Sequence, residues 1–533
     1  MARSLGTRQG GPVPASVLER AVQECAHTLS FLVHDTPVGA VVLLRQVLRA
    51  IPGVALSAWL FKALAYLSGR SKYLLHRPGS NGVRTLLNAY LLLEAAFALV
   101  HAWSKARGQA ASSGAGAGAG ALACRVARAA ERRVFVQRCL DSVRHAGDFI
   151  VPWFSRADGG AVRLGEIRRG NLEQLFAWAF FDKQPAALDA EERGEVGEYL
   201  GELARSRGVE LLEGHNGALR CKRFTHEPVE SSNRPLAYYL VTHLLVQRVV
   251  APLSMRALGF GAMRTAPRCF NYYVRHAPRG TGDEQQQSRQ QKTPIVFFHG
   301  IGLGPQLYVK NLRALVQAAG GARDMLVVEM PAIAQQLFPK PLLPDSFVED
   351  LRDVLREEGF PAKNCYAGHS YGTFVMAWVV KRAPELVHSL AFLDPGPFML
   401  HNSVTLQAIV YATPKSRPAE MFAYYMREEL FFNNHLRRDF HWRDNSLFFE
   451  QISPDTPALV IMSESDGIMP VQEVELLYKI SAGKHAMGHV DLLVLPNAIH
   501  AFLMLTSYAD VVAGQIENML LAKEREGAAR EPA

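Results

Sequence analysis

The chain has 533 residues, of which 49% are hydrophobic and 20% are charged, and its formal net charge is +8. This length allows more than one domain, and the composition is that of a protein that builds an apolar core. The positive charge is not gathered into a basic stripe interleaved with aromatic residues, which argues against nucleic acid as a partner.

The six cysteines lie far apart in the chain. None has the CxxC spacing that is typical of zinc sites, and they do not suggest a disulfide framework. Residues 1–14 lack the apolar core of a secretory signal peptide. We therefore expect an intracellular protein with reduced cysteines and no metal site.

The first part of the chain is both basic and apolar. Residues 1–110 hold 12 Lys and Arg against 4 Asp and Glu, and anionic membrane surfaces attract such segments. Two apolar stretches lie at 51–68 and 85–103, each interrupted by a charge, Lys62 and Glu94 respectively. A bilayer is spanned by about 20 apolar residues, so both stretches are marginal. Residues 1–106 are expected to be helical, either as a membrane-embedded hairpin or as buried helices of a soluble protein.

The middle of the chain carries no recognisable chemistry. A Gly- and Ala-rich segment, 107–123, predicts a flexible linker. Residues 124–267 read as a helical region of unknown role, in which 236–250 is apolar but broken by polar residues, so that a membrane span there is disfavoured. The Gln-rich segment 279–292 predicts a disordered surface loop.

Residues 268–525 are predicted to form an α/β domain. Short, near-continuous apolar runs alternate with helical segments, which indicates a mostly parallel sheet covered on both faces. One of the helices, 346–359, shows a capping box of Ser346 and Glu349. The predicted strands are 268–276, 294–299, 324–330, 364–369, 389–394, 458–463 and 490–496.

Residues 368–372 read Gly-His-Ser-Tyr-Gly. This G-x-S-x-G pattern directly follows an apolar strand and directly opens a helix, which is the position of a nucleophile elbow. The two glycines relieve crowding at a sharp turn that would expose the hydroxyl of Ser370. We predict that Ser370 is a catalytic nucleophile.

A serine hydroxyl needs a positioned base, and His500 is the candidate because it follows the last strand and precedes the final helix. The third member should be an acid that orients the imidazole. We favour Asp466, just past the strand 458–463, since the chain order Ser, Asp, His then matches the order that accompanies a G-x-S-x-G nucleophile elbow. Glu464 and Asp394 remain alternatives.

Residues 268–523 resemble the α/β-hydrolase superfamily, through PIVFFHGIG, YAGHSYGT, LDPG and SESDGIMP followed by His500. The whole chain is similar to a group of eukaryotic members with a long N-terminal extension and a WF…N…WAFF region, here Trp153, Phe154, Asn171 and 178–181. That second resemblance implies membrane association. Together they imply the α/β-hydrolase fold preceded by a mainly helical N-terminal region.

In this fold the oxyanion of the reaction is bound by two backbone N–H groups. One should belong to Tyr371, the residue after the nucleophile, and the other to Ile301, the residue after His-Gly. A lid is expected at about 398–456, where aromatic and Met residues suit an acyl chain or a membrane contact. His435 and His441 in this segment read as surface residues.

The sequence thus predicts a membrane-associated, lipase-like serine hydrolase of carboxylic esters that acts on a small-molecule or lipid ester without a cofactor. Two alternatives remain. One is an acyltransferase with the same three residues, in which an alcohol replaces water. The other is a non-catalytic binding or scaffold protein that keeps the fold.

Overall fold

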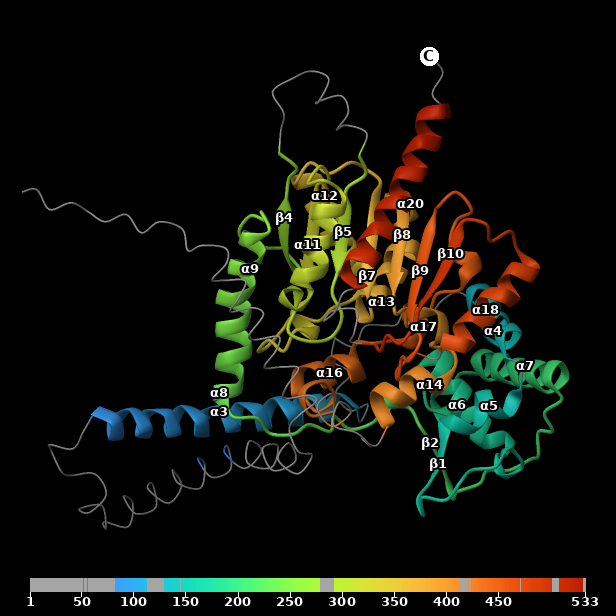
Figure 1. The fold of residues 1–533 in the computed structure, drawn as a ribbon. Coiled ribbons are helices and arrows are strands. Elements are labelled where there is room, and N and C mark those ends of the chain that lie inside the picture. Colours follow the sequence, from blue (N-terminus) through green and yellow to red (C-terminus); the bar gives the residue numbers. More distant parts are fainter. Residues whose placement is uncertain are drawn as a thin grey trace, which may run out of the picture.

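The computed structural model gives the arrangement of most of the chain (Figure 1). Three of the segments discussed above lie wholly or largely outside the described residues. They are most of 51–68, 113–123 of the segment 107–123, and 279–291 of the segment 279–292. The described residues are 51, 55, 82–112, 129–143, 145–278, 292–412, 420, 423–469, 471–500 and 508–530.

An eight-stranded sheet forms the centre of the molecule, with the strand order β10-β9-β8-β7-β5-β6-β4-β3. The strands from β10 to β6 are parallel, whereas β4 and β3 at the other edge are antiparallel. The mostly parallel sheet predicted from the apolar runs is therefore confirmed. Its strands are β3 (Arg264–Thr265), β4 (Asn271–Arg275), β5 (Ile295–Phe298), β6 (Met325–Glu329), β7 (Asn364–His369), β8 (Val387–Leu393), β9 (Ala458–Ser463) and β10 (Val490–Leu495).

Helices cover both faces of this sheet. Alternate residues of β5 point to opposite faces, so that Ile295 and Phe297 pack with α11 and α20, and Val296 and Phe298 pack with α12 and α13. Burial on both faces explains why the strands are apolar throughout rather than alternating. The covering helices are α11 (Val309–Ala318), α12 (Pro344–Glu357), α13 (Tyr371–Arg382), α18 (Val471–Lys484) and α20 (Tyr508–Arg530).

The capping box predicted for α12 is wrong. The helix begins at Pro344, and its N-cap is Leu343, whose side chain makes no capping hydrogen bond. Proline suits the first helical position because its missing N–H would have no partner inside the helix. Ser346 therefore lies inside the first turn instead of before it.

Between β8 and β9 the chain forms a helical insertion that lies beside the end of the sheet where β7 and β8 finish (Figure 1). Lys381 of α13 joins the insertion to the domain through the carbonyl groups of Asp444 and Ser446. The elements of the insertion are η10 (Pro397–Met399), α14 (Ser403–Leu406), η11 (Gln407–Tyr411), η12 (Ala423–Arg427), α16 (Leu430–Arg438), α17 (Trp442–Asn445) and η13 (Phe449–Gln451).

The helical region before the sheet packs on this insertion and shares one continuous apolar core with it. The indole N–H of Trp442 donates to Ala179 O at 2.9 Å, and Arg443 donates to Phe180 O at 3.1 Å. The insertion is thus held from two sides. The elements of the region are α4 (Ala129–Ser142), α5 (Ala146–Ile150), η2 (Val151–Trp153), β1 (Phe154–Arg156), η3 (Leu164–Glu166), α6 (Arg169–Phe181), η4 (Pro185–Ala187), α7 (Ala190–Arg207), β2 (Leu219–Cys221) and η5 (Phe224–His226).

Two further helices are long and apolar enough to cross a membrane, judged by length and composition. The first is α3 (Gly82–Ser112), which contains the predicted stretch 85–103 and continues into the segment predicted as a linker. The second runs over Leu236–Ala257 as α8 (Leu236–Tyr239), η6 (Leu240–Val250) and α9 (Ala251–Ala257), and we call it the α8–α9 helix. In each, only 22% of the most apolar window is buried.

Candidate active site

The turn between β7 and α13 holds Ser370 in an unusual conformation. Its φ of 51° and ψ of −114° lie in a region that residues with a side chain rarely adopt. The amide of Ser370 donates to Leu393 O at 2.9 Å, which ties the turn to the neighbouring strand. Such a strained strand-to-helix turn is the local geometry of a nucleophile elbow.

The two glycines of the motif are required by close contacts. A Cβ on Gly372 would lie 2.8 Å from the carbonyl carbon of Phe298, and one on Gly368 would lie 2.9 Å from the carbonyl carbon of Gly372. Real Cβ atoms do not approach backbone this closely. The absence of side chains therefore lets α13 begin directly against β5.

Replacing Gly372 by alanine should lower the free energy of unfolding by about 3 kcal/mol or more, because backbone atoms would have to move. Gly514 in α20 is the matched control, since nothing lies within 4 Å of its added Cβ. Gly514→Ala should raise stability by about 0.5–1 kcal/mol. Urea unfolding followed by tryptophan fluorescence measures both, and equal stability of the two variants would contradict the close contact at Gly372.

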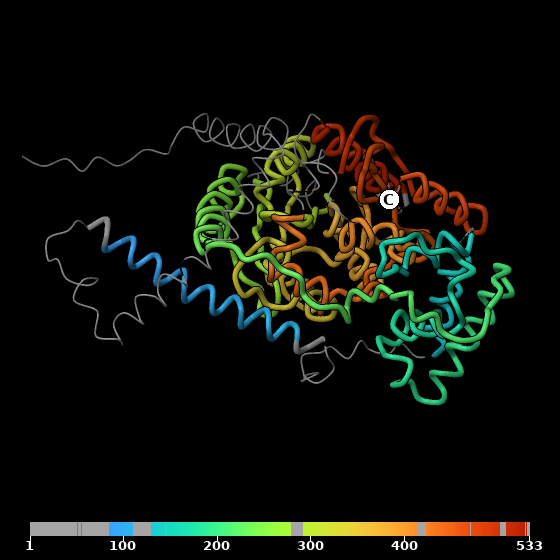
Figure 2. Tube along the Cα trace, turned by 90° about the horizontal axis from the view of Figure 1, so that it is seen from below, coloured from blue at the N-terminus to red at the C-terminus, as the bar shows by residue number. Residues whose placement is uncertain are grey.

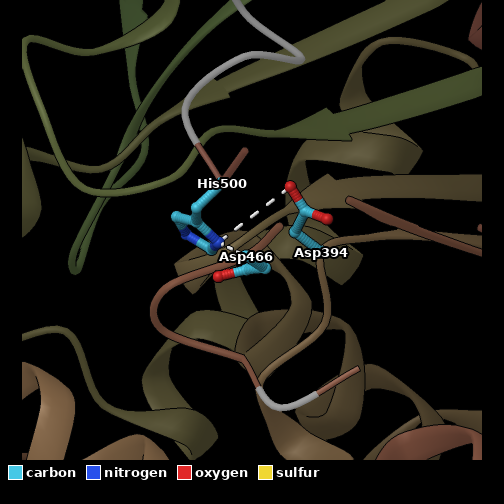
Figure 3. Close-up of side chains that lie close together, drawn as sticks. All are labelled: Asp394, Asp466 and His500. Atoms are coloured by element: carbon cyan, nitrogen blue, oxygen red, sulfur yellow. Dashed lines mark hydrogen bonds and ion pairs between the residues drawn. The ribbon is translucent and has the colours of Figure 1, made fainter. Parts of the chain in front are cut away.

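Ser370, His500 and Asp466 form a continuous chain of hydrogen bonds. Ser370 Oγ lies 2.8 Å from His500 Nε2, and His500 Nδ1 lies 2.6 Å from Asp466 Oδ2. The other carboxylate oxygen of Asp466 accepts the amides of Ile468 and Met469 at 2.7 and 2.9 Å. The acid is thereby fixed by the loop after β9, and it fixes the imidazole in turn (Figure 3).

The two alternative acids have other partners. Asp394, at the end of β8, accepts the amide and the hydroxyl of Ser463 at 2.7 and 2.9 Å, and its nearest oxygen is 3.9 Å from His500 Nδ1. Figure 3 shows both carboxylates beside the same imidazole nitrogen, with Asp466 the nearer of the two. Glu464 accepts the amide of Asn497 at 2.8 Å. Of the three candidates, Asp466 is the one hydrogen-bonded to His500.

Residues 293–425 match the family model of the alpha/beta hydrolase fold. The C-terminal domain is an α/β-hydrolase domain. No curated protein matches the chain. Similar solved structures include a bacterial membrane phospholipase A, at 15% identity and a TM-score of 0.35 over 54% of this chain and 94% of that one. A carboxylesterase from Bacillus subtilis is similar at 14% identity and a TM-score of 0.35, over 54% and 99% of the two chains.

Two carboxylates raise the pKa of His500 in the α/β-hydrolase domain. Burial lowers this pKa, but the hydrogen bond and charge of Asp466 and the more distant charge of Asp394 outweigh it, so that the net direction is upward. A raised pKa means that the imidazole is a stronger base than a free histidine. The ring can therefore hold a proton taken from the Ser370 hydroxyl.

The loop after β5 is held against the nucleophile elbow by Tyr308. Its hydroxyl accepts the amide of Gly300 at 2.7 Å and lies 2.8 Å from His369 Nδ1, while His369 Nε2 lies 3.2 Å from His500 O. A Cβ on Gly300 would lie only 3.1 Å from His369 O. The backbone before Ile301 is thus packed against the backbone before Ser370.

The prediction that His435 is a surface residue is wrong. His435 in α16 is buried, and its Nε2 lies 2.7 Å from the hydroxyl of Tyr371, with its Nδ1 3.2 Å from Asp439. The amphipathic pattern of α16 turns this face of the helix towards the domain. His441 is half-buried.

The cluster of Asp394, Asp466 and His500 offers ligand atoms that lie within 4.8 Å of one another. Asp394 already uses both oxygens to accept from Ser463, and the His500–Asp466 separation is that of a short hydrogen bond. These contacts fit an imidazole oriented by Asp466, with Asp394 held by Ser463, better than a set of ligands around an ion.

Proposed function

We propose that the protein is a membrane-associated serine hydrolase of carboxylic esters, with Ser370 as nucleophile, His500 as base and Asp466 as the acid that orients it. The observation that carries this proposal is the unbroken chain from Ser370 Oγ through the imidazole to Asp466, at 2.8 and 2.6 Å. The strained backbone at Ser370 supports the same role.

The reaction begins when Ser370 Oγ attacks the ester carbonyl carbon and its proton passes to His500 Nε2. The tetrahedral intermediate then collapses, the bond to the alcohol oxygen breaks, and the departing alcohol takes the proton from His500. Water attacks the acyl-enzyme in the same way, with His500 accepting and then returning one proton. The carboxylic acid leaves, and the Ser370 hydroxyl is restored.

The negative oxygen of each tetrahedral intermediate would be bound by the backbone N–H groups of Ile301 and Tyr371. This assignment is supported by the packing of Gly300 against His369, which brings the two loops together. Tyr371 is also the first residue of α13, whose N-terminal dipole favours negative charge. One such donor contributes roughly 3–4 kcal/mol to the transition state.

Membrane association is supported by α3 and the α8–α9 helix, because only 22% of the most apolar window of each is buried. Ser370 itself is 8% exposed. A lipid or other apolar ester would suit such a buried hydroxyl better than a polar substrate.

A fluorophosphonate probe tests the proposal, because the activated hydroxyl displaces fluoride from phosphorus and becomes covalently labelled. Folded wild-type protein should be labelled, and the mass shift should map to the peptide that contains Ser370. Ser370→Ala should abolish labelling, whereas Ser206→Ala in α7 should leave it unchanged. Absence of labelling in folded wild-type protein would contradict the proposal.

A further inference from the structure

The α8–α9 helix has an apolar face that points away from the protein and a face with polar residues that points towards it. Most of its large aliphatic side chains face outward, although Tyr239 and Met255 are buried, and the polar side chains of Thr242, Gln247 and Ser254 are buried as well. A helix on the surface of a soluble domain normally turns its apolar stripe to the core. The outward stripe consists of Leu240, Val241, Leu244, Leu245, Val249, Val250 and Leu253, which are 36% to 51% exposed.

The inward polar residues bind two loops of the α/β-hydrolase domain. Gln247 donates to Leu303 O and, at 3.1 Å, to Ala334 O. His243 Nδ1 accepts the amide of Leu337 at 3.0 Å. Leu303 is two residues beyond Ile301, so this helix holds the loop that carries a proposed oxyanion donor.

The helix α3 runs crosswise to the α8–α9 helix and is locked to it. The buried carboxylate of Glu94 accepts a hydrogen bond from the amide of Leu236, the first residue of α8, at 2.8 Å. Phe97 makes an edge contact with Tyr239. Figures 1 and 2 show the N-terminal part of α3 extending past α8, away from the sheet. Along that part, Leu86, Leu87, Leu92 and Leu93 are at least half exposed.

Few other large apolar side chains of the described residues are as exposed as those on these two helices. Contiguous apolar patches of this kind mark a site for a membrane or a protein partner. Phe338, 56% exposed, adds to the patch from the residue after Leu337. Arg248 and Arg256 lie exposed on the α8–α9 helix itself, where they can reach anionic headgroups.

We propose that the occupant is an anionic lipid bilayer. The α8–α9 helix lies along its surface with the outward stripe in the acyl boundary, and the N-terminal part of α3 enters the bilayer beside it. The crosswise arrangement suits this pose, since one helix can lie in the membrane plane while the other crosses it. The docked helix then holds the Ile301 loop at the lipid surface, a consequence that rests on the proposed function.

The docking is tested with a polarity-sensitive fluorophore on full-length protein. Leu244→Cys carries the label in a background in which Cys25 and Cys124 are serine, because the other four cysteines are buried. Arg205→Cys in α7 is the control on the opposite side of the molecule (Figure 1). In vesicles of phosphatidylcholine and phosphatidylserine with nitroxide-bearing acyl chains, we expect strong quenching at residue 244 and none at residue 205.

Ser370→Ala in the same background makes the quenching independent of catalysis, so a failure here and a failure of the proposed function are distinguishable. Three results would overturn the docking surface. The first is equal quenching at residues 205 and 244, and the second is no quenching at residue 244. The third is an apolar environment of the label at residue 244 in the absence of vesicles, which would mean that a second copy or residues 51–68 cover the patch.

The link to the active site is tested by turnover of a soluble short-chain ester and of a vesicle-borne ester. Leu244→Asp with Leu245→Asp should lower the ratio of vesicle-borne to soluble turnover at least about tenfold. Val134→Asp, at an exposed apolar position in α4, should leave that ratio unchanged.

Gln247→Ala should lower kcat for the soluble ester with little change in KM, as expected for a positioning residue. An unchanged ratio in the double variant, or an unchanged kcat in Gln247→Ala, would contradict the proposed link between membrane docking and the active site.

Discussion

Replacing Ser370 by alanine should lower kcat for an ester substrate by roughly 10⁴–10⁶, and adding His500→Ala should lower it little further. The reason is geometric, since Ser370 Oγ and His500 Nε2 act as one unit at 2.8 Å. Without the hydroxyl there is no proton for the imidazole to accept. Steady-state rates of the two single variants and the double variant measure this coupling.

Additive losses in the double variant would mean that the two residues act in separate steps. The control is Tyr308→Phe, which removes a buried hydroxyl next to the elbow but no reacting group. That variant should lose stability, by about 1–3 kcal/mol, because the amide of Gly300 loses its acceptor. Its kcat should stay well above that of Ser370→Ala.

Asp466→Asn should lower kcat by roughly 10⁴, because the amide cannot stabilise the imidazolium and would hold the wrong tautomer. Asp394→Asn should lower kcat by no more than about tenfold, since Asp394 lies 3.9 Å from His500 and bonds to Ser463 instead. Comparison of the two variants separates the acid that orients the base from the one that supplies only charge. Similar losses in both would assign the orienting role to the pair.

The raised pKa of His500 predicts the direction in which kcat/KM changes with pH. His500 must be neutral to accept a proton, and its pKa is raised by Asp466 and Asp394 against the lowering effect of burial. Wild-type kcat/KM should therefore fall as the pH drops through this raised pKa. Asp394→Asn removes one of the two charges, so its acidic limb should move to lower pH. A shift to higher pH would contradict the charge assignment.

The strands and the three residues of the hydrogen-bond chain could be predicted because each leaves a local trace in the sequence. Apolar runs between helices mark a sheet that is buried on both faces. Ser370 lies in a G-x-S-x-G turn, and Asp466 and His500 follow strands at the same end of the sheet. No comparable trace marks Tyr308, His369 or His435, because each contributes through a contact that only the folded chain brings about.

The polar residues of the α8–α9 helix bear on more than the question of a membrane span. In the sequence, His243, Gln247 and Arg248 interrupt an apolar run and make a span less favourable. In the structure Gln247 and His243 turn towards the domain, whereas Arg248 is exposed with the apolar stripe. Helical periodicity alone does not say which face meets the protein, because that depends on what each neighbour offers to bind.

The shared core of the N-terminal helical region and the insertion has a practical consequence for cutting the gene. Phe135, Phe180, Trp442 and Phe448 form one aromatic cluster, drawn from both sides of position 268. A recombinant fragment that starts at residue 268 would keep Trp442 and Phe448 while discarding their counterparts. Such a truncated product would expose apolar aromatic side chains to solvent and tend to aggregate. Expression in soluble form therefore requires the upstream helices as well.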